Sequence, residues 1–269
     1  MKLRRSLALT AAVCALVAGA AACGSDDDPK DPGSPFQKDK SNSSSKPEEK
    51  QAESNGVTEL SAKEIGDKSL ETLKQATSMH MVGTADGAKL DLLLDNSGNC
   101  RGTMGLEGIE MEMLRKGESF WLKGDEGFWS MAVGKDADAA KAVVGDRYML
   151  VPAGDEQYGD MVETCDLEKM TASMTEDSAE TTYTKGEVTE VNGTPAIELN
   201  YKDTDGTGTI YVSTVGKPYP LKVDDKSSTQ PAAIVFSDFD KPVDVQAPPD
   251  DKVLDVSVLE DMADEGTAA

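Results

Sequence analysis

The sequence predicts a single α+β domain built around an antiparallel sheet, and two observations carry that prediction. Apolar and polar side chains alternate in two blocks, residues 90–122 and 185–237, as they do in half-buried strands. Helix-forming segments lie before the first block and between the two blocks. One strand–helix–strand pattern over about 200 residues is typical of a single α+β domain.

The domain begins with a helix that we predict over residues 62–77. Ser61 and Glu64 have the spacing of a capping box, in which each side chain bonds the backbone N–H of the other residue. Leu60 and Ile65 occupy the hydrophobic-staple positions around it. One face of the helix is small or apolar and is expected to meet the sheet: Ile65, Ser69, Leu73 and Ala76.

The first block contains short strands joined by tight turns. Residues 109–113 alternate strictly between apolar and acidic side chains. Leucines alternate with aspartates over residues 90–95, Leu93 excepted, and Phe120 and Leu122 flank Trp121 in the same way. Gaps this short between strands favour antiparallel hairpins. The turn sequences lie at residues 85–87, 96–98, 116–117 and 124–125.

A helical insert separates the two blocks. Residues 137–144 are rich in alanine, and Gly145 suits the end of that helix. Residues 155–174 predict one or two more helices, the second capped by Asp166. Strands then return, and Asn192-Gly193 is a strong hairpin signal between two of them. The expected strands cover residues 185–191, 196–201, 209–214, 221–225 and 233–237.

The N-terminal residues predict an export signal followed by a lipid anchor. Lys2 and two arginines precede an apolar stretch over residues 7–19, which is too short to remain as a membrane span. Small residues then lead to Cys23, as in the lipobox of bacterial lipoproteins. We expect residues 1–22 to be removed and acylated Cys23 to hold the protein on the extracytoplasmic face of the cell membrane. The alternative is an ordinary secretory signal cut at an Ala-x-Ala site, with Cys23 incidental.

The rest of the chain divides by composition. Residues 23–58 are acidic, rich in serine and proline, and nearly devoid of apolar side chains. Such a segment buries too little surface to offset its ordering entropy, so we expect a disordered linker from Cys23. The folded domain is expected over residues 59–255, and residues 256–269 form an acidic C-terminal tail.

The four cysteines have separate predicted roles. Cys14 leaves with the signal and Cys23 is acylated, so Cys100 and Cys165 remain for one intramolecular disulfide. An exported protein in an oxidising compartment favours that bond, and two buried free thiols are the alternative. Two isolated cysteines and His80, the only histidine, make a poor metal-ligand set, so we expect no metal and no cofactor.

The net charge of −23 excludes one class of partner. Nucleic-acid binding needs lysine and arginine to neutralise phosphate, so a surface this acidic argues against it. The simplest interpretation of the charge is solubility outside the cell.

Catalysis has little support in the sequence. Residues 203–210 match the first positions of a calcium-binding loop, but Thr207 and Thr214 stand where acidic ligands are needed, so a hairpin turn is the better interpretation. His80 lies between two methionines and is more typical of a sheet residue than of a general base. No Gly-x-Ser-x-Gly elbow and no phosphate-binding glycine loop is present, so we do not expect an enzyme.

Methionines are concentrated between residues 79 and 174. Their flexible, polarizable side chains suit an apolar pocket that accommodates acyl chains, and ordinary filling of the core is the alternative.

Several short segments carry a resemblance to a known family. They are the Cys23 lipobox and residues 76–80, 99–103, 120–124, 216–221, 239–243 and 247–249. In these segments the chain resembles the LolA/LppX-type bacterial lipoproteins, especially the actinobacterial LppX/LprG group. The resemblance implies a strongly curved antiparallel sheet, a half-barrel, with helices packed on its concave face. It also implies an apolar cavity between sheet and helices that holds lipid acyl chains.

The expected function follows from this resemblance. It is non-catalytic binding or transport of a lipid or other amphiphile, and the alternative is a structural or regulatory envelope lipoprotein that binds protein partners. The resemblance supplies no polar ligand set that can be carried over to these residues. Alternation alone selects the candidate pocket residues: Ile65, Leu73, Leu92, Met111, Met113 and Leu122.

Overall fold

The computed structural model describes residues 53–133, 137–152, 154–155, 158–174, 181–204, 206–227 and 231–255. They belong to one compact unit. The predicted signal, Cys23, most of the predicted linker and the acidic tail lie outside the described residues. Within these ranges, no helix is long and apolar enough to cross a membrane.

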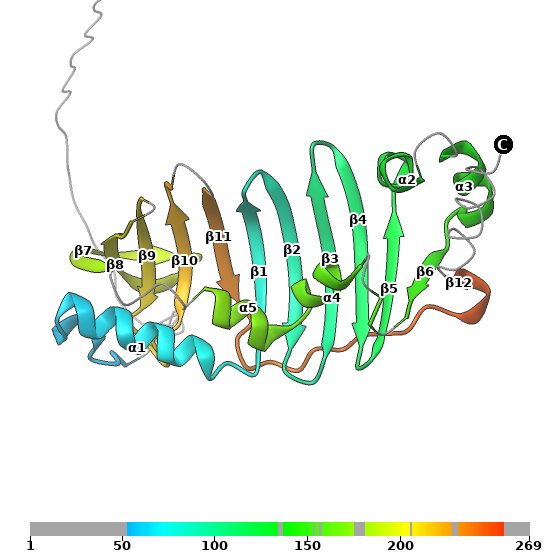
Figure 1. Ribbon diagram of the computed structural model, residues 1–269. Helices are drawn as coiled ribbons and strands as arrows, with labels where there is room; N and C mark the ends of the chain where they lie inside the picture. Colours follow the sequence, from blue (N-terminus) through cyan, green and yellow to red (C-terminus); the bar gives the residue numbers. More distant parts are fainter. Residues whose placement is uncertain are drawn as a thin grey trace, which may run out of the picture. The chain divides into compact units, whose positions relative to one another are not determined.

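A single 12-stranded sheet dominates the fold (Figure 1). The strand order is β12-β6-β5-β4-β3-β2-β1-β11-β10-β9-β8-β7, so the sheet is curved but open, with β12 and β7 at its two edges. Neighbouring strands pair antiparallel, except that β12 runs parallel to β6. The strands are β1 (Ser78–Ala85), β2 (Ala88–Asp95), β3 (Asn99–Leu106), β4 (Ile109–Lys116), β5 (Ser119–Gly124), β6 (Tyr148–Val151), β7 (Thr182–Val191), β8 (Thr194–Lys202), β9 (Thr207–Ser213), β10 (Pro220–Asp225), β11 (Ala232–Ser237) and β12 (Val253–Asp255).

The strand order forces the chain to cross one face of the sheet. β6 lies near one edge and β7, the next strand in sequence, forms the opposite edge. The connection carries α4 (Gly159–Thr164) and α5 (Leu167–Ser173), which lie over the strands together with α1 (Ala62–Lys74) (Figure 1). α2 (Glu126–Val133) and α3 (Ala137–Val144) fill the separate connection between β5 and β6. The predicted half-barrel with helices on its concave face is therefore confirmed.

Burial follows the alternation of the strands. Met111 and Met113 of β4 are buried, whereas Glu110 of the same strand is exposed. The face covered by the crossover forms one large apolar cluster that includes Met79, Met81, Leu92, Met113, Phe120 and Met149. A second cluster lies beneath α1 and joins Val57, Ile65, Ile197, Leu199 and Val212. The sheet thus buries one face and leaves the acidic residues of the other face in water.

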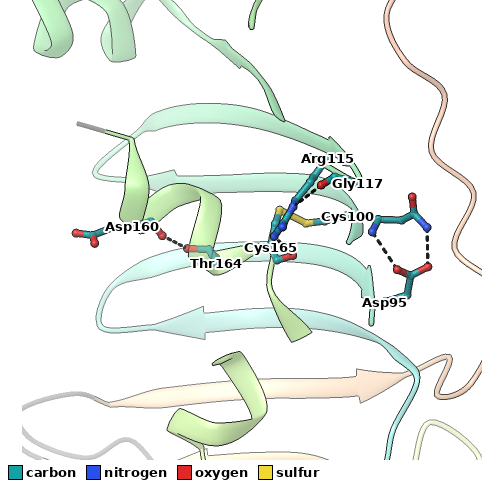
Figure 2. Close-up of a disulfide and its surroundings, with 8 residues drawn as sticks. Asp95, Cys100, Arg115, Gly117, Asp160, Thr164 and Cys165 are labelled. Atoms are coloured by element: carbon teal, nitrogen blue, oxygen red, sulfur yellow. Dashed lines mark hydrogen bonds between the residues drawn. A yellow bond between two sulfur atoms is a disulfide. The ribbon is translucent and has the colours of Figure 1, made fainter. Parts of the chain in front are cut away.

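A disulfide attaches the crossover to the sheet (Figure 2). Cys100 on β3 is bonded to Cys165, which lies between α4 and α5, as the sequence predicted. Arg115 on β4 reinforces this point, because its Nη1 donates to the Cys165 carbonyl at 3.2 Å while its Nε donates to the Gly117 carbonyl at 3.0 Å. The covalent bond and the guanidinium together hold the middle of the crossover against the concave face.

The C-terminal segment runs along the ends of the strands from β11 to β12 (Figure 1). Asp240 anchors its start by accepting from the Thr77 N–H at 3.0 Å and from the Tyr219 hydroxyl at 2.8 Å. Burial acts to raise the pKa of Asp240, but the hydrogen bonds from Lys217, Thr77 and Tyr219 outweigh it and hold the pKa far below its usual range. Phe239 stacks on Tyr219 with ring centroids 3.9 Å apart.

Most predicted elements are present. The capping box of Ser61 and Glu64 forms, although the helix ends at Lys74 and not at residue 77. Asp166 caps α5 by accepting from the Lys169 N–H at 3.1 Å, and Asn192-Gly193 joins β7 to β8. The sequence patterns did not predict α2, β6 or β12.

The folded part begins earlier than predicted. Residues 53–58 were assigned to the linker, yet Val57 is fully buried in the cluster beneath α1. Asn55 fixes this segment by donating to the Ser213 carbonyl at 3.0 Å, and Ser54 bridges to Val215. A segment with one apolar side chain can still be ordered when its polar groups bond to the sheet, which composition does not reveal.

We predict that replacing both bridged cysteines, Cys100→Ser with Cys165→Ser, lowers the free energy of unfolding by about 4 kcal/mol, because the bond closes a long loop in the unfolded chain. Their separation of 65 residues sets this magnitude. Urea unfolding followed by circular dichroism measures it, and the wild type in reductant serves as the matched control. Equal unfolding midpoints for the oxidised wild type and the double variant would contradict the assigned role.

Candidate functional site

A cavity of about 330 Å³ lies between the helices and the half of the sheet formed by β7–β11. α1 and the end of α5 lie on one side of it, and the strands lie on the other (Figure 1). Its apolar lining consists of Leu70, Leu73, Met174, Ile210, Pro220, Val223, Ala232, Ile234 and Phe236. Its polar lining consists of Ser173, Thr181, Tyr183, Tyr201, Asp203, Asp225 and Ser227.

The strand register separates these two linings along the cavity. Val223 pairs with Ile210 on one side and with Ile234 on the other, which makes an apolar row across three strands. Asp225 is two residues further along the same strand, so its side chain points to the same face. Asp225 pairs with Gly208, and Gly208 pairs with Tyr201, which makes a polar row over β8–β10 beside the apolar one; on β11 the same row continues as Ala232. Over β8–β10 the cavity is therefore lined by an apolar row and, next to it, a polar row.

Two glycines make room for the tyrosines of the polar lining. A Cβ at Gly66 of α1 would lie 3.0 Å from the ring of Tyr183. A Cβ at Gly208 of β9 would lie 2.5 Å from the Tyr201 hydroxyl and 2.6 Å from the Asp224 carbonyl. Because backbone lies so close at Gly208, a side chain there would displace either the phenol or the strand. Both rings therefore owe their positions to the absence of a side chain opposite them.

Hydrogen bonds orient the carboxylates of the polar lining. Asp203 Oδ1 accepts from the Gly206 N–H at 2.8 Å, and Asp225 Oδ1 accepts from the Ser227 N–H at 2.7 Å. Burial raises the pKa of the Tyr201 phenol well above its usual range, and the charge of Asp225 and a hydrogen bond to Asp225 raise it further. The phenol is therefore a neutral donor at physiological pH. No lysine, arginine or histidine occurs among the described residues that line the cavity.

The candidate pocket residues from the sequence lie in three places. Leu73 lines the cavity. Ile65 packs in the cluster beneath α1. The other four, Leu92, Met111, Met113 and Leu122, lie in the large cluster on the crossover side of the sheet. Alternation identified the correct face of the sheet for them, but it does not distinguish packed core from cavity wall.

The cavity residues that the sequence did not single out as pocket residues include all of its polar lining. Tyr201 and Asp225 are the last residues of the strands predicted over residues 196–201 and 221–225. Each side chain faces the interior, where an apolar side chain is usual. An inward-facing polar residue at the end of an apolar alternation is the signal that could have identified them. The methionines mainly fill the core, since Met79, Met81, Met113 and Met149 are almost fully buried, while Met174 lines the cavity.

The outer face of the sheet carries a second depression, of about 360 Å³. His80 Nε2 lies 2.7 Å from Asp91 Oδ1, and His80 Nδ1 lies 3.8 Å from Asp238 Oδ2. Arg101 and Glu112 also line it, and Glu112 accepts from the Tyr148 hydroxyl at 2.8 Å. Thr103 lines the depression as well, and Ser237 Oγ on β11 lies 3.5 Å from His80 Nδ1.

The segment that resembled a calcium loop is a hairpin connection. β8 ends at Lys202 and β9 begins at Thr207, and the two strands pair antiparallel. Asp205 lies outside the described residues. Among the residues that the structure describes, no group of three or more His, Cys, Asp or Glu side chains is arranged to hold a metal ion.

Comparison with known proteins gives matches among solved structures. The chain is similar to lipoprotein LppX of Mycobacterium tuberculosis, with 11% identity, a TM-score of 0.45, and coverage of 69% of this chain and 98% of that one. It is similar to LprF of Mycobacterium bovis, with 14% identity, a TM-score of 0.49, and coverage of 70% and 96%. A LolA superfamily protein of Nitrosomonas europaea matches with 10% identity, a TM-score of 0.24, and coverage of 71% and 96%.

These matched structures include LppX-type and LolA-type proteins, the group to which the sequence pointed. No family model and no curated protein sequence matches the chain.

Proposed function

We propose that this protein is a membrane-anchored lipoprotein that binds one amphiphile in the cavity between α1, α5 and β7–β11, without catalysis. The observation that carries this proposal is the division of the cavity into an apolar row at Val223 and a polar row at Asp225. An amphiphile has the same division, with an apolar tail and a polar head. Burial of the tail against Leu73, Ile234 and their neighbours supplies the free energy of binding.

The size of the cavity limits the ligand. Small-molecule pockets measure roughly 300–1,000 Å³, and the cavity volume of about 330 Å³ is at the lower end of that range. It suits a single short chain with a compact head better than a lipid with several long chains. Leu73 belongs to α1 and Met174 directly follows α5, so a small outward shift of either helix would enlarge the space.

The anchor is the second part of the proposal. Cys23 follows a run of small residues and precedes a segment of about 30 residues that is poor in apolar side chains. A flexible chain of that length spans roughly 30 Å, enough to hold the domain away from the membrane surface. Acyl chains on Cys23 would supply an attachment that the acidic domain, with its net charge of −23 for the full chain, does not favour by itself.

A second candidate function is binding of a protein partner in the envelope. The outer-face depression favours it, because His80, Arg101 and three carboxylates surround Leu93 and Leu114 there. A mixture of charges around apolar side chains is typical of protein interfaces. The two functions use opposite faces of the sheet and can be tested separately.

We predict that Val223→Trp reduces the affinity for a neutral dodecyl glycoside at least tenfold, because an indole at this position fills the apolar row. Isothermal titration calorimetry below the critical micelle concentration measures the affinity, with the Cys23→Ala protein as the unacylated background.

The matched control is Val82→Trp, since Val82 is 41% exposed and does not line the cavity. It should bind as the parent does, and circular dichroism should show that both variants are folded. Equal affinities of the two variants for the glycoside would contradict the cavity proposal. It would also be contradicted if the Cys23→Ala protein bound no amphiphile with a dodecyl tail.

We predict that Cys23→Ala transfers the protein from the membrane fraction to the medium, because the acylated side chain is the proposed attachment. Immunoblotting of the two fractions measures this, and Cys14→Ala, which alters only the predicted signal, should leave the protein attached. Persistent membrane attachment of the Cys23→Ala protein would refute the anchor.

A further inference from the structure

We propose that the polar lining of the cavity selects the headgroup, so that the site takes a single-chain amphiphile with a positively charged, N–H-bearing head and disfavours an anionic head. This inference rests on the proposed function and adds the chemical class of the ligand to it. It is carried by Tyr201, Asp203 and Asp225, which the register and the cavity lining place beside the apolar row.

The position of Asp225 makes it a contact for a head and not for a tail. Val223 and Asp225 are two residues apart on β10, and Asp225 is at the end of the strand. A tail lying along Ile210, Val223 and Ile234 would therefore bring its first polar group to the row of Asp225 and Tyr201. Asp203 and Ser227 lie beyond that row and also line the cavity, so the head meets acceptors on more than one side.

The chemistry of these side chains favours a ligand headgroup that donates hydrogen bonds. An ionised carboxylate accepts hydrogen bonds at about four lone-pair positions and donates none. Asp225 already accepts from the Ser227 N–H at 2.7 Å, which holds the carboxylate in place, and it acts on the neighbouring Tyr201 phenol. Such a fixed carboxylate can still accept from an ammonium head, and hydrogen bonds between charged groups are stronger than neutral ones.

The charges around the cavity oppose an anionic head. Among the described residues that line it, the two charged ones are both aspartates, and lysine, arginine and histidine are missing. An anion placed there would be desolvated without a counter-charge, which is costly in a partly enclosed site. The nearest donor is the Tyr201 phenol, and it already interacts with Asp225, which raises the pKa of the phenol. A cationic head at the same position would instead be paired with Asp203 and Asp225.

The test is a series of ligands that share a dodecyl tail and differ in the head: dodecylammonium, a neutral dodecyl glycoside and dodecanoate. Each is titrated below its critical micelle concentration into the full chain carrying Cys23→Ala. We expect dodecylammonium to bind at least tenfold more tightly than the glycoside, and dodecanoate to bind most weakly. We expect Asp225→Asn and Asp203→Asn each to reduce the preference for ammonium over glycoside by about tenfold.

Two controls separate the site from the general acidity of the protein. Asp224→Asn removes the same charge one residue away, where Asp224 pairs with Lys222 at 2.8 Å and does not line the cavity. It should leave the headgroup preference unchanged. Val223→Trp should remove dodecylammonium binding together with glycoside binding, because both tails use the same row.

The outcomes distinguish this inference from the proposed function. Equal affinities for the three heads, or equal effects of Asp224→Asn and Asp225→Asn, would overturn the headgroup assignment and leave amphiphile binding intact. Dodecylammonium binding that survives Val223→Trp would show attachment to the acidic surface and would also overturn the assignment. Failure of every ligand to bind would overturn the proposed function itself.

Discussion

The attachment of the β6–β7 connection to the concave face of the sheet is the constraint on which the rest of this structure depends. Consecutive strands at opposite edges of a 12-stranded sheet require a connection that traverses one face. The Cys100–Cys165 bond fixes the middle of that connection to β3. α4 and α5 then cover the apolar cluster of the β1–β6 half, and α5 meets α1 over the other half. The cavity exists where those two helices lie over the strands without filling the space beneath them.

The chemical division of the cavity lining comes from the register of four strands. Antiparallel pairing of β8, β9, β10 and β11 aligns apolar side chains in one row and polar side chains in the next. Gly208 allows the Tyr201 ring to lie across β9, which brings the phenol to Asp225. The division between an apolar row and a polar row is thus a property of backbone pairing, and no single residue produces it. This is why amphiphile binding and headgroup choice can fail independently.

Much of the fold could be predicted from local sequence signals. The capping box at Ser61, the cap at Asp166 and the Asn192-Gly193 turn depend on residues within a few positions of each other, and each is present. The alternation over residues 109–113 likewise gave the correct buried face. The disulfide could be predicted because only two cysteines remained after Cys14 and Cys23 were assigned. Strand β12 could not be predicted, because its three residues form a strand only through parallel pairing with β6, which lies more than 100 positions earlier in the chain.

The cavity wall was the part that sequence predicted least. Of the six candidate residues, Leu73 alone lines it, because alternation reports which side of a strand is buried and not what covers that side. Under α4 and α5 the buried side chains of Leu92 and Met113 meet other side chains and form core. Near α1 and the end of α5 the buried face of β10 and β11 meets empty space. That difference is set by the placement of the helices, which depends on long-range contacts.

A crystal structure of the Cys23→Ala protein with bound dodecylammonium would show directly whether the cavity binds the amphiphile and its head. We expect electron density for the tail along Val223 and Ile234, beneath Leu73, with the nitrogen within hydrogen-bond distance of Asp225. Density confined to the outer face near His80, or an unchanged cavity with no ligand at saturating concentration, would contradict this expectation.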